Sequence, residues 1–295
     1  MKPLDILNNP WAIVPDKLFE IQEIYNTHLR GEKIDLAALE AQTGEPLQSN
    51  RQPYQVLDGI AIIPIHGVIA KRMNMFTRIS GGVSTQILTR DTQEAIDDPD
   101  VKGIIYDIDS GGGEVDGTAE LAQTIYKSRG VKPIVAYSDG VIASAAYWIA
   151  SATDQVFISG DTVQVGSIGV VATHVDYSEY EKKKGIKTTE VYAGKYKRIA
   201  SEHKPLSDEG LETIQDRVDY IYSVFVDVVA KHRNTNTENV ISRMADGRLF
   251  IGQQAVSAGL VDGVITFDEL LNSVVPQLAE TTESQNYFSK LEAKL

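Results

Sequence analysis

The segment DGVIASAAYWIA holds the residue whose setting best suits a nucleophile, Ser144. The apolar run KPIVAYS ends shortly before it, Asp139 and Gly140 predict a turn, and a helix of small residues follows. Unpaired N–H groups and the dipole at a helix start favour developing negative charge. Serines in small-residue helices are more often packing residues, so it is the position at a strand-to-helix turn that indicates catalysis.

A second chemical signal lies upstream, where the run VKGIIYDI leads into three successive glycines, Gly111 to Gly113. The loop could be a tight turn or a phosphate cradle, but G-x-G-x-x-G and the P-loop lysine are both missing. Three glycines cost backbone entropy, which indicates a backbone that must approach something closely. We therefore expect the N–H groups of Gly113 and Ala145 to form an oxyanion hole, and Gly111 and Gly112 to contact the substrate.

The general base is harder to assign. Lys197, in AGKYKRIAS, follows a strand-like run and the Gly194 turn. A lysine acts as a base near pH 7 only when desolvation lowers its pKa by several units. Spacing alone does not separate Lys197 from Lys195 or Lys204. Among the five histidines, only His174 is kept as an alternative base, because none lies in a segment with a second catalytic signature.

Composition narrows the classes of protein. A chain of 295 residues can bury one substantial core, and its net charge of −13 disfavours nucleic acids and anionic membranes as main partners. Without cysteine there is no disulfide, thiol nucleophile or cysteine-ligated zinc. The N-terminus lacks a signal-peptide pattern, and no segment reaches the roughly 18 apolar residues of a membrane span. We expect a cytoplasmic protein without a membrane anchor, metal or organic cofactor.

Three regions follow from the patterning. Residues 1–53 predict a helical N-terminal extension and a linker, residues 54–275 the main domain, and residues 276–295 a polar tail. The extension either packs on the body or a neighbouring subunit, or is a pro-segment trimmed during activation.

Within the main domain, short β-rich runs alternate with helical stretches, which predicts βαβ units and an α/β fold. Ser84 is a candidate helix cap, and a long helix is expected from Ser207 to His232. Strands are expected at 168–173 (IGVVAT) and 187–193 (KTTEVYA), among others.

Four stretches resemble the signal peptide peptidase A (SppA) family, relatives of ClpP within the ClpP/crotonase fold. They are DIDSGGGEV, VIASAAYWIA, VGSIGVV and DGRLFIGQQAVSAGLVDGV, and they occur in the family's order. The resemblance spans roughly residues 59–267 and implies a ClpP/crotonase-like fold of repeated ββα and βαβ units.

The resemblance also implies a serine–lysine dyad protease with Ser144 as nucleophile. Lys197 falls at the family lysine in G-x-x-K-x-x-x-S, and Ser167 falls where a serine hydroxyl holds the lysine amine. ClpP proteins carry a histidine near that strand, and its absence here favours lysine. Gly111 replaces a usual proline, and Ala145 stands where many members have glycine, departures that leave the predicted catalysis intact.

The start NPWAIVPDKLFEI and the stretch FTRISGGVS resemble the phage and prophage branch of head-maturation proteases. That resemblance implies a homo-oligomer acting on a scaffold, portal or capsid protein, in the host cytoplasm or the assembling head, or else acting as a soluble SppA-like peptidase. Two alternatives stay open: a crotonase-like acyl-CoA enzyme, which shares the fold and the glycine loop, and a non-catalytic capsid-assembly protein.

Overall fold

A computed structural model describes residues 10–15, 17–18, 54–72, 82–280 and 282. Its largest sheet has six strands in the order β13-β10-β8-β6-β3-β2. These strands are β2 (Gln55–Leu57), β3 (Ile60–His66), β6 (Gly103–Asp109), β8 (Ile134–Ser138), β10 (Gln155–Ile158) and β13 (Gly263–Val264). All neighbours pair in parallel except β2 and β3. The α/β class predicted from the sequence is confirmed.

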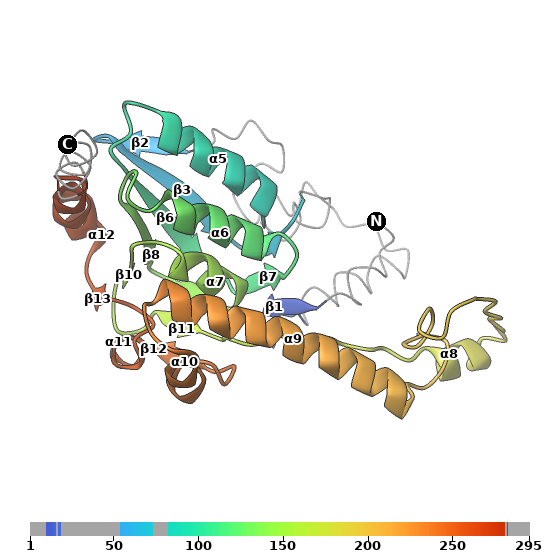
Figure 1. Ribbon diagram of the computed structural model, residues 1–295. Helices are drawn as coiled ribbons and strands as arrows, with labels where there is room; N and C mark the ends of the chain where they lie inside the picture. Colours follow the sequence, from blue (N-terminus) through green and yellow to red (C-terminus); the bar gives the residue numbers. More distant parts are fainter. Residues whose placement is uncertain (1–9, 16, 19–53, 73–81, 281, 283–295) are drawn as a thin grey trace, which may run out of the picture.

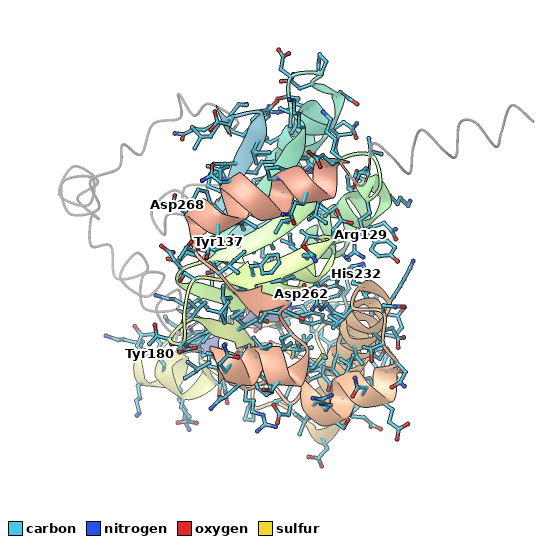
Figure 2. The ribbon with its side chains drawn as sticks, turned by 90° about the vertical axis from the view of Figure 1, so that its left-hand side faces the viewer. Arg129, Tyr137, Tyr180, His232, Asp262 and Asp268 are labelled. Atoms are coloured by element: carbon cyan, nitrogen blue, oxygen red, sulfur yellow. The ribbon has the colours of Figure 1, made fainter. Side chains whose placement is uncertain are left out.

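Both faces of this sheet are covered, which explains why its strands read as nearly continuous apolar runs. One face packs against α5 (Thr85–Asp97), α6 (Thr118–Ser128) and α7 (Ala145–Ser151) (Figure 1). The opposite face, represented by Ile105 and Val135, packs against α12 (Phe267–Glu269) and the following π-helical turn η1 (Leu270–Val274). In Figure 2, Tyr137 lies beside the helical segment that begins with α12, and its ring meets that of Phe267 edge-on, with ring centroids 5.3 Å apart.

Two small sheets sit beside the main one. The first has the order β1-β7-β4-β5, and the second β12-β11-β9. Their strands are β1 (Trp11–Ile13), β4 (Ile69–Ala70), β5 (Val83–Ser84), β7 (Gly112–Glu114), β9 (Val141–Ala143), β11 (Gln164–Gly166) and β12 (Leu249–Ile251). β7 contains Gly112 and Gly113 of the glycine loop, and β9 leads directly into Ser144, so these short strands position the predicted site.

The long helix α9 (Asp208–His232) begins where the sequence predicts its start, and Ser207 caps it by accepting the N–H of Gly210 with its Oγ at 3.1 Å. Apart from Gly210 at its start, its buried residues, such as Phe225 and Val229, lie in the C-terminal half. The N-terminal half projects from the body together with α8 (Ser178–Lys183) and residues 184–207 (Figure 1). We call residues 176–215 the arm.

The C-terminal end of α9 is fixed to the body. The guanidinium of Arg129 donates to the carbonyls of Ala152, Ser151 and His232. Figure 2 shows Arg129 and His232 close together, away from Tyr180 of the arm. Two further helices, α10 (Thr237–Arg243) and α11 (Gln253–Ala258), complete the region beside α9.

Several local expectations are confirmed and others corrected. Ser84 caps α5 as expected. The predicted strand at 187–193 is wrong, because those residues have no regular structure, and of 168–173 only Val171 forms a β-bridge. Most of the predicted helical extension and linker, residues 1–53, lies outside the described residues, but its segment Trp11–Ile13 is a strand. Of the predicted tail, residues 276–280 continue a helix.

Candidate active site

Ser144 occupies the turn between β9 and α7. Its φ of 56° is rare for a residue with a side chain, and such strained strand-to-helix turns present nucleophilic serines in other folds. Backbone bonds hold the turn: Ser144 N–H donates to Gly166 at 2.8 Å, and Trp148 N–H donates to the Ser144 carbonyl at 2.9 Å. The serine is 1% exposed, and its Oγ has no hydrogen-bond partner among the described residues. The Ser144 hydroxyl is therefore not committed to a structural hydrogen bond within the described residues.

The glycine loop packs directly against Ser144. Gly112 has a φ of 103°, and a Cβ there would lie 3.0 Å from both the Cβ of Ser144 and the carbonyl oxygen of Ala143. Only glycine allows this approach. Ser110 fixes the loop, because its Oγ accepts the Gly112 N–H at 3.1 Å and donates to the carbonyl of Gly67 at 2.6 Å.

The remaining predicted backbone positions lie around this contact. Ala145 is buried and is the first residue of α7, where N–H groups have no partner within the helix. Gly111 follows β6, and Gly113 is the central residue of β7, paired with β1 on one side and with Ile69 of β4 on the other.

Ser167 lies beside Ser144. β11 and β9 are parallel, and Gly166 pairs with Ala143, so the two serines leave neighbouring strands at the same level. Ser167 is also buried, with a φ of 51°, and its N–H donates to the carbonyl of Arg248 at 2.8 Å. The structure therefore brings together Ser144, Ser167 and the glycine loop.

The structure does not bring Lys197 to this place within one chain. Lys197 is exposed and belongs to residues 184–207, which lie with α8 at the far end of the arm, whereas α7 lies in the body (Figure 1). Its N–H donates to the carbonyl of Gly194 at 3.1 Å. Neighbouring Lys195 pairs with Glu209 of α9.

A polar network gives this part of the arm a defined shape. Arg198 pairs with Glu190 and, at 3.1 Å, with Glu202. His203 Nδ1 lies 2.7 Å from Glu181 of α8.

The described histidines all have partners other than Ser144. His174, the alternative base, lies with Nε2 3.1 Å from the carbonyl of Ser201. His66 pairs with Asp107 at 3.1 Å, and His232 Nδ1 lies 3.0 Å from Ser151 Oγ. Burial, with the charges of Arg129 and Lys231, lowers the pKa of His232 to about 3. His28 lies outside the described residues. A histidine base for Ser144 thus gains no support from the described part of the chain.

Strand β1 is the feature of the site that sequence patterning missed. It pairs antiparallel with the glycine loop, Ala12 opposite Gly113 and Ile13 opposite Gly112. The alternation of large and small residues in WAI was its only signal, too short to distinguish a strand. Among the described residues, no group of three His, Asp or Glu side chains is arranged to hold a metal ion, and no helix is long and apolar enough to cross a membrane.

The chain is similar to a known peptidase family and to several known proteins. The model of peptidase family S49 matches residues 127–280. Capsid assembly protease C of Escherichia phage lambda is 31% identical over 242 residues, covering 82% of this chain and 53% of that protein. Head-tail preconnector protein GP5 of Enterobacteria phage P21 is 29% identical over 249 residues, covering 83% and 49%. The chain thus spans about half the length of these two phage relatives.

A protein of Enterococcus faecium named as a signal peptide peptidase SppA is 32% identical over 268 residues, covering 89% of this chain and 74% of that one. Similar solved structures include a crotonase-type enoyl-CoA hydratase/isomerase from Legionella pneumophila, with a TM-score of 0.44, 15% identity and 81% of each chain covered. A ClpP1 mutant from Listeria monocytogenes gives a TM-score of 0.42 at 14% identity, covering 70% of this chain and 91% of that one.

Proposed function

Because this chain belongs to peptidase family S49, we propose that it is a serine endopeptidase in which Ser144 is the nucleophile and Lys197 the general base. The observation that carries the proposal is the Ser144 hydroxyl: buried, without a partner, and held by a strained turn against the glycine loop. A merely structural buried hydroxyl would normally be hydrogen-bonded.

The reaction uses each group in turn. Ser144 Oγ attacks the carbonyl carbon of the scissile peptide bond while its proton passes to Lys197 Nζ. The N–H groups of Gly113 and Ala145 stabilise the negative oxygen of the tetrahedral intermediate. Lys197 returns the proton to the departing amine, and water then hydrolyses the serine ester. Ser167, which leaves the neighbouring strand, orients the lysine amine.

Lys197 is supplied by a neighbouring copy of the chain. The arm carries it away from its own body, and the arm is rich in exposed apolar side chains: Tyr180, Ile186, Val191, Tyr192 and Tyr196. Such a surface is typical of a protein interface. Docking of the arm on the next subunit would bury these side chains and Lys197 together. Loss of water around an amine disfavours its charged form, and the neutral form is the one that can accept a proton.

The names of the relatives support a proposal for the substrate class. Two phage relatives are named for capsid assembly and for the head-tail preconnector, so we assign to this chain the cleavage of a scaffold, portal or capsid polypeptide during head assembly. This would occur in the host cytoplasm or in the assembling head. Family membership favours peptidase chemistry over the acyl-CoA alternative, and the test below separates it from the non-catalytic alternative.

The test follows hydrolysis of an unfolded polypeptide by wild type, Ser144→Ala and Lys197→Ala proteins. Both variants should lose nearly all activity, whereas Lys195→Ala, on the same segment, should keep most of it. Equal amounts of the two inactive variants, mixed by dissociation and reassembly, should regain about a quarter of wild-type activity, because the lysine of one subunit then meets the serine of another. If the mixture stays inactive, the lysine acts within its own chain. If either single variant cuts at the wild-type rate, the dyad is wrong.

A further inference from the structure

Strand β1 fills a slot between the two backbone segments that frame Ser144. On one edge it pairs with the glycine loop, and the pairing extends to the N–H of Val14, which donates to the carbonyl of Gly111 at 2.9 Å. On the other edge Trp11 exchanges both its backbone bonds with Val171, at 2.8 and 2.9 Å. Val171 belongs to the segment that follows Ser167. We call the space between β7 and Val171 the β1 slot.

The register of β1 brings one peptide carbonyl to the nucleophile. Neighbouring residues of a strand direct their N–H and C=O groups to opposite edges. Because Trp11 faces Val171, the N–H and C=O groups of Ala12 face Gly113, the residue assigned to the oxyanion hole. The carbonyl oxygen of Ala12 would lie 2.3 Å, and the Cβ of Ser144 3.0 Å, from a Cβ placed on Gly112. The Ala12 peptide and the serine therefore meet at the same glycine.

The side chains of β1 hold it in the slot. Trp11 and Ile13 are almost fully buried and form a small apolar cluster with Leu18 and Val68, against which the partly buried Val171 packs. Between them Ala12, fully buried, presents only a methyl group. The slot thus accepts an extended segment in which a small residue stands between two large apolar ones.

The slot continues past the strand. A cavity begins where the pairing of β1 with Val171 ends, lined by Pro10, Ala172 and His174 and by arm residues such as Arg198 and Glu202. A polypeptide longer than β1 would find space there for its N-terminal part.

We propose that β1 is an internal occupant of the peptide-binding slot, with Ala12 in the place of the residue whose carbonyl is attacked, and that polypeptide substrates bind by displacing it. The inference rests on the proposed function for the role of Ser144. Extended peptides commonly bind by adding a strand to an exposed sheet edge, and here the chain's own N-terminal segment satisfies that edge. The site selects substrates with a small residue flanked by large apolar residues.

The test measures peptide binding in the Ser144→Ala background, so that catalysis is not the readout. A fluorescent peptide with the sequence of residues 9–15, NPWAIVP, is titrated while its anisotropy is followed. An added Ala12→Arg change should expel β1, because the long charged side chain does not fit where the Ala12 methyl group is fully buried in the apolar core. We expect peptide affinity to rise at least tenfold. The matched control, Val56→Arg, adds the same charge at an exposed position of β2 and should leave affinity unchanged.

A disulfide that fixes β1 in the slot tests the same inference by comparing the oxidised and reduced forms of one variant. The chain has no cysteine, so Trp11→Cys with Glu114→Cys in the Ser144→Ala background offers one specific bond between directly opposed strand residues. The reduced form should bind the peptide and the oxidised form should not.

Equal binding by the oxidised and reduced forms of the double-cysteine variant would overturn the inference. So would a peptide that binds neither the Ala12→Arg variant nor the reduced double-cysteine variant. Both results are independent of whether wild type hydrolyses polypeptides, so failure of the proposed function would be recognised separately.

Discussion

The indole of Trp148 stacks on the ring of Phe225, with centroids 4.3 Å apart and planes 12° from parallel. Trp148 stands one helical turn after Ser144 on α7, and Phe225 lies in the buried half of α9. Together with the hydrogen bond between Ser151 and His232, this contact connects the helix that follows the nucleophile to the buried half of α9, whose other half belongs to the arm.

Truncation of this contact should cost stability. Phe225→Ala leaves a cavity against Trp148 and is expected to lower the free energy of unfolding by about 3–5 kcal/mol, measured by urea denaturation. Ile241→Ala, at an exposed position of α10, should change it by less than about 0.5 kcal/mol. Similar losses for both variants would contradict the structural role of the stack.

Gly112 should be irreplaceable for activity. A methyl group there meets Ala12, Ala143 and Ser144, so Gly112→Ala should lower kcat/KM by about 100-fold or more through displacement of the oxyanion loop. Gly130→Ala is the matched control: its φ of 80° is also left-handed, but nothing lies within 4 Å of the added carbon. It should cost about 1 kcal/mol of stability and leave peptide hydrolysis nearly unchanged. If both variants lost activity equally, the loss would be due to the strain of a left-handed alanine and not to the contacts of the added methyl group at residue 112.

His232 should make stability depend on pH. Its folded-state pKa of about 3 lies below the unfolded value of 6.5, so the unfolded chain binds the extra proton between these values. The contribution of neutral His232 is fully present above about pH 6.5 and is lost as the pH falls toward 3, by about 1 kcal/mol per pH unit. In His232→Gln, which can still bond to Ser151, urea midpoints should vary less between pH 6.5 and 4.5. An unchanged pH slope would assign the effect to other groups.

Ala12→Arg in the otherwise wild-type chain should lower KM for a polypeptide substrate at least tenfold and change kcat little. The reason is that an occupied slot reduces apparent affinity by the fraction of molecules in which it is free. Steady-state kinetics against Val56→Arg provide the comparison. A KM equal to that of wild type would mean that β1 and substrate do not compete.

Local signals predicted much of this architecture. The cap at Ser84 and the long helix expected from Ser207 to His232 depend on residues a few positions apart, and both are confirmed. The failures are non-local. β1 was missed because its partners, at Gly112 and Val171, lie about 100 residues or more along the chain. The predicted strand at 187–193 has suitable residues, but β propensity acts through packing against a partner, which these residues lack in the described part of the chain.

The site shows the same division. The turn at Ser144 and the run of three glycines that allows a close backbone approach are local features and were recognised in the sequence. The position of Lys197 is not a local feature, because it depends on an arm whose direction is set by the burial of only one half of α9.

The arm also gives the proposed enzyme a dependence on its own abundance. A dilute, solitary copy would hold its lysine in open water and its serine without a proton acceptor, and would therefore be inert. Catalysis would begin only where copies crowd together, so that a growing assembly could switch on proteolysis by gathering the subunits, with no separate activator.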